Sequence, residues 1–322
     1  MRVDSRDNKR KLAGRRGGAP QVSFLIRAYN EQRFISSKLE DLTSRLRKFD
    51  VRCEIILGIQ GDDSSYKIAK LFSDRLKNIR VYKMPKPDLI GTTNFLIGKA
   101  RGEIIIFDDA DNLFVGDLNE VVRIFDDKKV GGIINEDDST AELYNSGQKV
   151  FDRAYFDVKL RHHSKAMGKE KKYICVTDPI FSTNIVRRSA LSARPYTKTF
   201  GTDTEVTKIL IDKGYFVVYS APLLYYIRNS PLQDNLTVKK IFARRTRTEQ
   251  FRAQAKQRLD SNRFEVGSRM GEFVEAILLT YSRVNLSEFF AFTQYIIIII
   301  AATIYGRIMK IFVDKGRFIQ IR

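Results

Sequence analysis

Apolar and polar positions alternate in blocks along the first third of the chain. Four mainly apolar runs predict buried strands, and they cover residues 21–28, 53–59, 78–84 and 103–109. The stretches between them mix apolar and polar positions in the manner of helices, and they cover residues 34–48, 66–76 and 92–102. Strands that alternate with helices predict an α/β fold with a mostly parallel sheet and crossover helices. Ligands bind such sheets at the carboxyl ends of the strands.

Carboxylates follow the fourth apolar run at once. Asp109 and Asp111 lie just past the predicted strand, two positions apart, so their side chains point the same way if the chain stays extended. Two carboxylates so close repel each other unless a cation bridges them, which predicts a hard divalent ion such as Mg²⁺ or Mn²⁺. The alternative is a solvated turn between strand and loop, where aspartate is common. Asp108 is expected to be solvated or structural.

The charge of the chain narrows the partners. Lysine and arginine number 57 against 38 aspartates and glutamates, a formal charge of +19. Such an excess predicts a polyanionic partner, which is nucleic acid, an anionic membrane surface or a phosphorylated substrate. Residues 1–20 are basic and are expected to form a disordered tail. The two cysteines, Cys53 and Cys175, fit a reducing compartment better than a disulfide framework.

Six segments, in order, resemble those of a family 2 glycosyltransferase with the A-type nucleotide-sugar-binding fold. They are VSFLIRAYNE, EIILGIQGDDSSYKIAKLF, TTNFLIGKARGEIIIFDDADN, FSTNIVRRSAL, GTDTEVTKILIDKGYFVVYS and FARRTRTEQF. The resemblance implies a Rossmann-like catalytic domain over residues 21–250, followed by a helical region over 251–322. It also implies a donor that is a nucleotide-diphosphate sugar and a glycan or polyprenyl-linked acceptor, with transfer of the hexosyltransferase type.

The resemblance assigns roles to individual residues. Asp109 and Asp111 correspond to the Asp-x-Asp metal motif, and Asp203 corresponds to the catalytic base of an inverting transfer. The residues expected to bind the donor nucleotide are Tyr29, Glu31, Gln60, Asn94, Asp109, Arg244 and Arg247. Without the family resemblance, Asp203 is an acidic residue in the first turn of a helix, where acids are favoured, and the arginines form a solvated helix face.

Three departures from the family pattern affect specificity. Gln60 stands where the family usually has an aspartate that reaches the uracil, so the base of the nucleotide stays open. Thr202 replaces a glutamate ahead of the base. Arg244 and Thr248 replace the glutamine and tryptophan on which processive polysaccharide synthases depend, which implies transfer of a single sugar.

The C-terminal region contains an apolar segment. Residues 289–305 carry no charge and lie near the lower length limit for a membrane-spanning helix. The basic residues that follow oppose a single crossing, because positive charge favours the cytosolic side. We expect an in-plane or re-entrant helical hairpin, formed with residues 273–281, at the cytoplasmic face of the cell membrane. The alternative is a buried core helix.

Two other function classes compete with this interpretation. A sugar nucleotidyltransferase would carry a glycine-rich basic loop after the first strand, where this chain has AYNEQR. A non-enzymatic protein that binds nucleic acid or an anionic membrane is compatible with the charge, but no helix-turn-helix, zinc-knuckle or aromatic-basic RNA motif is present. The sequence therefore predicts an inverting, metal-dependent glycosyltransferase with no nucleic-acid partner.

Overall fold

The computed structural model describes most of the chain from residue 19 to residue 313. The described ranges are 19–110, 112–134, 146–166, 173–177, 183–192, 196, 202–219, 226–229, 242 and 270–313. Asp111, Arg244, Arg247 and residues 1–18 of the predicted tail lie outside them, as does the side chain of Asp203.

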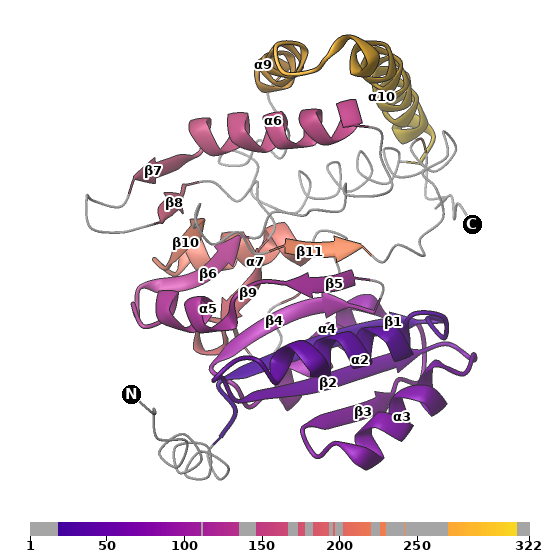
Figure 1. The fold of residues 1–322 in the computed structure, drawn as a ribbon, viewed down its shortest axis with the longest axis vertical. Helices are drawn as coiled ribbons and strands as arrows, with labels where there is room; N and C mark the ends of the chain where they lie inside the picture. Colours follow the sequence, from indigo (N-terminus) through magenta and orange to yellow (C-terminus); the bar gives the residue numbers. More distant parts are fainter. Residues whose placement is uncertain are drawn as a thin grey trace, which may run out of the picture.

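A nine-stranded sheet organises the described residues from 22 to 219 (Figure 1), with the strand order β3-β2-β1-β4-β9-β6-β10-β8-β7. Its first four strands in the chain are β1 (Val22–Tyr29), β2 (Cys53–Gln60), β3 (Ile79–Lys83) and β4 (Ile104–Asp109). The others are β6 (Val130–Ile134), β7 (Ser164–Ala166), β8 (Ile174–Val176), β9 (Thr183–Arg187) and β10 (Phe216–Tyr219). Within the sheet, β8 and β9 run against the remaining strands. The prediction of a mostly parallel α/β sheet is confirmed.

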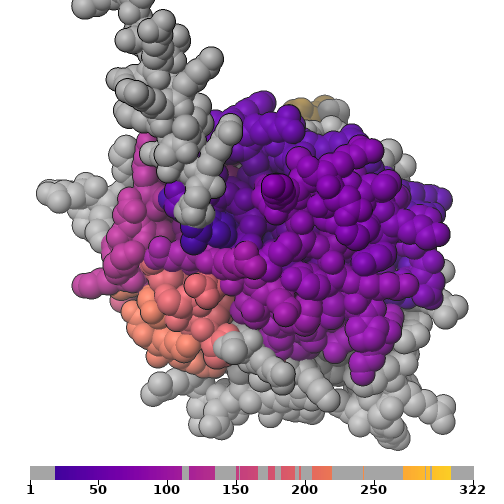
Figure 2. Space-filling view, turned by 90° about the horizontal axis from the view of Figure 1, so that it is seen from below, coloured from indigo at the N-terminus to yellow at the C-terminus, as the bar shows by residue number. Residues whose placement is uncertain are grey.

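Helices cover both faces of the sheet, because successive strand residues point to opposite sides. The α-helices are α2 (Ile35–Leu46), α3 (Ser65–Arg75), α4 (Leu89–Lys99), α5 (Leu118–Ile124), α6 (Ser146–His162), α7 (Thr202–Asp212), α9 (Met270–Tyr281) and α10 (Leu286–Val313), with a short 3-10 turn at Arg188–Ala190. Strand residues such as Phe24 pack with α2, α3 and α5. Their neighbours, such as Leu25, pack with α4 and α7 on the other face. Seen from below, the first half of the chain forms a broad face with the segment of α7 and β10, in orange, beside it (Figure 2).

Helix α4 begins and ends three residues earlier than the sequence pattern predicts. Asp88 caps its start, because the carboxylate accepts a hydrogen bond from the Gly91 N–H at 2.8 Å. After its end the chain passes close to β1, where a Cβ on Gly102 would lie 2.7 Å from the Ser23 backbone nitrogen. The helix ends because Ala100 takes up an extended backbone, with a φ of −66° and a ψ of 137°, and Gly102 then lets the chain pass close to β1.

A second layer of helices lies beyond the sheet, where α9 and α10 pack on α6 (Figure 1). Its core is aromatic, with the ring of Phe151 in α6 5.7 Å from the rings of Phe273 and Phe292. Helix α10 contains the apolar run predicted from the sequence, and α9 contains the shorter one. Among the described residues, α10 is the one helix long and apolar enough to cross a membrane, in the window Glu288–Tyr305.

Candidate active site

The carboxyl ends of β1, β2 and β4 meet at one edge of the sheet. These strands pair in parallel, so that Tyr29 is the register partner of Gln60, and Arg27 is the register partner of Asp109. Tyr29 is exposed at this edge, which suits the predicted role of lining a nucleotide pocket. The predicted donor residues of β1, β2 and β4 are therefore brought together.

The loops that follow β1 and β2 are held together by hydrogen bonds. Asn30 has a φ of 56° and accepts a hydrogen bond from the Asp62 N–H at 3.1 Å. Gly61 has a φ of 90°, and a Cβ there would lie 1.9 Å from the Asn30 Oδ1. The Glu31 N–H donates to the Ser65 hydroxyl at 2.9 Å. The main chain of Glu31 is thereby fixed at the site edge.

Asp63 contributes to the same connection. Its carboxylate accepts hydrogen bonds from the Gln32 N–H at 3.0 Å and from the Ser65 N–H at 2.9 Å. Partial burial works to raise the pKa of Asp63, but the hydrogen bonds from Ser65 and Gln32 outweigh it and hold the pKa below its ordinary value. Asp63 stays ionised at neutral pH and fixes the loop.

Gln60 is buried and turned toward helix α4. Its amide nitrogen donates to the Lys86 carbonyl at 3.1 Å, to the Asp88 carbonyl at 3.0 Å and to the Thr92 hydroxyl at 2.6 Å. These hydrogen bonds tie the Gln60 side chain to the start of α4 and to the residues just before it. If Gln60 reads the nucleotide base, it has to use its carbonyl oxygen, because the nitrogen is already bonded to protein acceptors.

Asp109 at the end of β4 is paired with Arg27. The Arg27 Nε and Nη2 lie 2.9 Å and 2.7 Å from the same carboxylate oxygen, Oδ1. The Asp109 side chain remains 43% exposed, so its other oxygen can meet a ligand. An arginine partner was not among the sequence predictions for Asp109.

Asp108 is buried and makes an ion pair. Its carboxylate lies 2.5 Å from the Lys38 ammonium, and both side chains are almost fully enclosed. Burial raises the pKa of Asp108, and the Lys38 charge opposes that rise. Oδ1 also accepts the Asp109 N–H at 2.9 Å. Of the two roles expected for Asp108, the solvated one is wrong, because Asp108 ties β4 to α2 directly beneath Asp109.

Asn94 is bonded to a distant part of the chain. Its side chain donates to the Tyr196 carbonyl at 3.0 Å and accepts from the Tyr196 N–H at 3.2 Å. The Tyr196 ring packs edge-on against Phe107 at 5.8 Å, on the strand that leads to Asp109. Asn94 therefore connects α4 with the segment that precedes α7. Its predicted contact with the donor stays a prediction.

The remaining predicted residues are placed only in part. Asp203 is the second residue of α7, so it lies in the first turn of a helix, as the sequence predicted. Asp111 falls between Asp109 and strand β5 (Asn112–Val115), which pairs with β11 (Tyr226–Asn229). Arg244, Arg247 and the carboxylate of Asp111 belong to the part of the chain that is not described.

The described residues suit an oxygen-liganded divalent ion only in combination with other ligands. No group of three or more histidine, cysteine, aspartate or glutamate side chains able to hold a metal occurs among them. Asp109 supplies a partly exposed carboxylate at the strand end, with no hydrogen bond from the described residues to Oδ2. A hard ion such as Mg²⁺ takes few protein carboxylates and completes its shell with water and phosphate oxygens, so this donor chemistry fits.

Comparison with known proteins identifies the fold and the family. The family model described as glycosyl transferase family 2 matches residues 23–194, more than half of the chain. The chain belongs to the family 2 glycosyltransferases. As the sequence predicted, this transferase takes a nucleotide-activated sugar as its donor. No curated protein sequence gives a significant match.

Solved structures resemble the transferase in fold. The mannosyltransferase PcManGT from Pyrobaculum calidifontis, in complex with GDP-Man and Mn²⁺, is 16% identical with a TM-score of 0.54. That match covers 92% of this transferase and 79% of the other chain. Residues 1–349 of S. aureus TarS, in complex with UDP-GlcNAc, are 13% identical with a TM-score of 0.45, and the match covers 94% of both chains. At 16% identity and a TM-score of 0.54, the likeness to the Pyrobaculum mannosyltransferase shows the fold alone.

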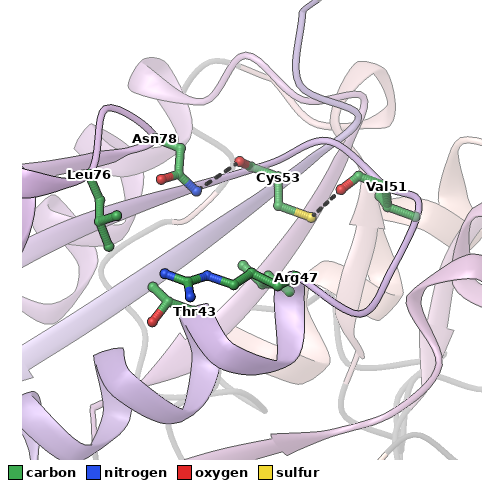
Figure 3. Close-up of a pocket in the computed structure, with 7 residues that line it drawn as sticks. Thr43, Arg47, Val51, Cys53, Leu76 and Asn78 are labelled. Atoms are coloured by element: carbon green, nitrogen blue, oxygen red, sulfur yellow. Dashed lines mark hydrogen bonds between the residues drawn. The ribbon is translucent and has the colours of Figure 1, made fainter. Parts of the chain in front are cut away.

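A pocket of about 210 Å³ lies away from the donor residues of the transferase (Figure 3). Its lining includes Cys53 and Asn78, which lie at the amino-terminal ends of β2 and β3. Asp109 and Gln60 lie at the opposite ends of their strands, so this pocket is not the donor site. Burial raises the pKa of the Cys53 thiol to about 12, so the thiol stays protonated.

Two charged residues near the site were not predicted to act there, although the sequence contains a signal for each. Arg27 interrupts an otherwise apolar buried strand, and a charge in such a run requires a partner. Lys38 occupies an inward position of α2, between the buried Ile35 and Leu42. Neither signal identifies the partner, because that depends on which strands and helices become neighbours.

Proposed function

We propose that this glycosyltransferase is metal-dependent and inverting, and that it moves a single hexose-type sugar to a lipid-linked or glycan acceptor. The observation that carries the proposal is the position of Asp109. It ends a buried parallel strand, its carboxylate is partly exposed, and Asp111 follows two positions later. The Pyrobaculum mannosyltransferase, which was solved with GDP-Man and Mn²⁺, supports the use of a divalent ion.

The residues at the strand ends divide the work of donor binding. Asp111 and Asp109 would hold Mg²⁺ or Mn²⁺, which would supply positive charge against that of the departing diphosphate. Tyr29 and Glu31 line the nucleotide pocket, and Gln60 with Asn94 holds helix α4 beside it. Arg244 and Arg247 bind phosphate, either of the donor or of a lipid acceptor, through their planar guanidinium groups.

Asp203 takes the proton of the attacking acceptor hydroxyl. Inversion requires a carboxylate on the acceptor side, opposite the leaving diphosphate. Asp203 lies in the first turn of α7, whose Val206 and Leu210 pack in the same core as α4. Helix α7 is thus anchored on the face of the sheet that also carries Arg27 and Asp109.

Arg244 and Thr248 replace the residues of processive synthases, which supports transfer of one sugar.

The outer helical layer supports attachment to the cytoplasmic face of the cell membrane. Helix α10 has two apolar faces. The face turned to α6 and α9 is buried and contains Phe292, Tyr295, Ile296, Ile299 and Ala302. The outward face exposes Phe289, Phe290, Ile297, Ile300 and Ile304. Because the inner face packs on the catalytic part, a helix lying in the plane of the membrane keeps both contacts, whereas a spanning helix would lose α6. The charge of +19 favours anionic headgroups.

A panel of sugar nucleotides tests the proposal. Purified protein is mixed with UDP-, GDP- and CDP-sugars, each with Mg²⁺, with Mn²⁺ or with EDTA, and thermal unfolding is followed. One nucleotide class should raise the unfolding temperature in the presence of metal and much less in EDTA, because ligand binding stabilises the native state. The same donor should yield free nucleoside diphosphate with an acceptor. Stabilisation that is equal with and without EDTA for every donor would contradict metal dependence.

A further inference from the structure

The pocket of Figure 3 lies where the end of α2, the start of β2 and the connection from α3 to β3 meet. Leu46, Val51 and Leu76 give it an apolar lining. Its volume of about 210 Å³ is below the roughly 300–1,000 Å³ of pockets for drug-sized ligands, whereas a cavity of about 150 Å³ holds a benzene ring. The pocket therefore fits a body the size of a single ring and is too small for a sugar nucleotide.

One charged side chain lines the pocket. Arg47 follows the last residue of α2, and its guanidinium lies beside Thr43 (Figure 3). Within the described part of the chain, no residue forms an ion pair or a hydrogen bond with this guanidinium. The nearby Arg45, in contrast, pairs with Asp41 at 2.7 Å. A guanidinium presents its N–H donors as a planar fork that matches a carboxylate or a phosphate, so Arg47 is free to bind an anion.

The surroundings of the pocket are also basic. Lys48 follows Arg47, and Lys77 follows the lining residue Leu76. Both lysines are exposed, and neither pairs with a carboxylate among the described residues. Burial raises the pKa of the Cys53 thiol to about 12, so the thiol adds no negative charge. Several positive charges around one pocket favour an anion with more than one charge, and a phosphate monoester carries nearly two at neutral pH.

Two features of the pocket oppose an anion, and both are weakened. Helices α2 and α3 end there, and helix C-termini carry partial negative charge. Carbonyl groups in their last turns are already bonded, because the Lys48 N–H donates to the Arg45 carbonyl and the Leu76 N–H donates to the Phe72 carbonyl, each at 2.9 Å. Asp50, in the connection from α2 to β2, is not among the lining residues. The basic side chains therefore determine the charge of the pocket.

We propose that this pocket is a binding site for a small phosphate monoester with an apolar body, separate from the donor site. Arg47 binds the phosphate group, the two lysines add positive charge, and the apolar body lies against Leu46, Val51 and Leu76. The donor residues lie at the opposite ends of the strands, so both sites can be occupied together. Helix α3 and strand β3 lie at the other end of the molecule from α10 (Figure 1), which favours a soluble ligand over a lipid headgroup. This inference does not depend on the proposed function.

Calorimetry on the full-length protein tests the site with two probes. Phenyl phosphate carries a ring that fits the pocket, and inorganic phosphate carries none. The variants are Arg47→Met, which removes the charge and keeps the apolar stem, and Cys53→Met, which fills the pocket from the start of β2. The control is Arg45→Met, which changes the net charge equally on the same helix, at an arginine that is already paired with Asp41. Each titration is repeated with Mn²⁺ and UDP, GDP or CDP present.

The two variants should separate the phosphate from the apolar body. Phenyl phosphate should bind the wild type about tenfold more tightly than inorganic phosphate does, because the ring buries apolar area. Arg47→Met should weaken the binding of both probes about tenfold. Cys53→Met should weaken phenyl phosphate about tenfold and leave inorganic phosphate within about twofold. Arg45→Met and the added nucleotides should change neither affinity.

Other outcomes overturn the inference. They are a wild type that does not bind phenyl phosphate, and equal binding by the wild type and Arg47→Met. Displacement of phenyl phosphate by a nucleotide would assign the phosphate to the donor site instead. If Cys53→Met fails to fold, judged by circular dichroism, the result for Arg47→Met and the competition with nucleotide decide.

A membrane arm distinguishes the source of the phosphate. Phosphatidylcholine vesicles with and without phosphatidic acid present the same phosphate monoester on a lipid. Flotation of Arg47→Met should match that of the wild type with both kinds of vesicle. A loss of flotation in Arg47→Met that is confined to vesicles with phosphatidic acid would show a lipid headgroup site and overturn the assignment to a small soluble ligand.

Discussion

Asn94 holds the backbone of Tyr196 by both of its polar groups, across 102 positions of the chain. The amide donates to the Tyr196 carbonyl and accepts from the Tyr196 N–H, as a neighbouring strand would do. Tyr196 in turn packs against Phe107, two residues before Asp109. One side chain of α4 thus connects strand β4 with Tyr196, which precedes α7 and Asp203 in the chain.

Replacing Asn94 distinguishes this structural role from direct donor contact. Asn94→Ala removes both hydrogen bonds between the α4 side chain and the backbone of the buried Tyr196, so the free energy of unfolding should fall by about 1–3 kcal/mol. Turnover should fall while the KM for the donor stays within about twofold. Urea unfolding and steady-state kinetics measure these quantities.

The control for this prediction is Asn78→Ala. The Asn78 amide makes a single long hydrogen bond of 3.4 Å to the Cys53 carbonyl, at the far end of the strands. It should change neither quantity. A tenfold rise in donor KM in Asn94→Ala, with the stability intact, would instead return Asn94 to the donor pocket where the sequence resemblance put it.

The sequence predicted the order and type of the first seven elements because their patterns are local. Isoleucine-rich runs between helical stretches leave few alternatives, and the boundaries differ from the structure mainly at α4. The sequence also predicted where the site lies, because ligands bind a parallel sheet at the carboxyl ends of its strands. The pairs Arg27–Asp109 and Lys38–Asp108 were not predicted, because each joins residues far apart in the chain. Periodicity encodes neither the register between β1 and β4, which sets the first pair, nor the packing of α2 on β4, which sets the second.

A buried carboxylate gives the stability of this protein a pH dependence. Glu54 accepts hydrogen bonds from the Ser23 hydroxyl at 2.6 Å, the Arg101 N–H at 2.7 Å and the Arg80 guanidinium at 2.6 Å. Burial works to raise the pKa of Glu54, but these bonds outweigh it and hold the pKa below the ordinary value of 4.5. The resulting stability is present above the unfolded-state pKa and is lost as the pH falls through the folded-state pKa.

Glu54→Gln removes this titrating group. At about pH 6 the variant should unfold with about 1–3 kcal/mol less free energy than the wild type, because Arg80 loses its charged partner. The difference should narrow as the pH is lowered toward about 3, because the wild-type carboxylate takes up a proton as the pH falls through its lowered pKa. The control is Glu40→Gln, because Glu40 accepts a hydrogen bond from Ser36 on the exposed surface of α2, and this variant should stay within about 0.5 kcal/mol of the wild type. A gap of constant size at both pH values would refute the assignment.

The proposed membrane attachment should depend on the outward face of α10. Phe290 and Ile297 are 70% and 62% exposed there, so Phe290→Glu and Ile297→Glu should weaken flotation with anionic lipid vesicles about tenfold or more, because they remove apolar contact and add negative charge. Leu71→Glu is the matched control, since Leu71 is a 57% exposed apolar residue on α3. If Phe290→Glu and Ile297→Glu float with the vesicles as well as the wild type and Leu71→Glu do, α10 does not contact the membrane.

The side on which the C-terminus lies tests the in-plane model separately. A cysteine is introduced at the C-terminus in a background in which Cys53 and Cys175 are replaced by serine, and sealed vesicles are treated with an impermeant thiol reagent. We expect labelling from the side that carries the catalytic domain, because both termini stay cytosolic. Labelling only from the opposite side would demonstrate a single span.

Asp203 should matter more for some acceptors than for others. A hydroxyl acceptor needs a base, whereas a lipid phosphate is already ionised near neutral pH. Asp203→Asn should therefore reduce transfer to a hydroxyl by about a hundredfold or more and only weaken transfer to a polyprenyl phosphate. Assays with both acceptor classes at saturating donor give the comparison. Wild-type rates with a hydroxyl acceptor would exclude Asp203 as the base.

Metal-dependent glycosyl transfer at the end of β4 is tested most directly by the release of nucleoside diphosphate in Asp111→Asn. This substitution keeps the size of the side chain and removes the charge that the ion needs. With its donor, an acceptor and Mn²⁺, the wild type should release nucleoside diphosphate, and EDTA should stop it. Asp111→Asn should fold as the wild type does and lose about a hundredfold or more in rate. Release by Asp111→Asn at the wild-type rate, or full wild-type activity in EDTA, would contradict the account.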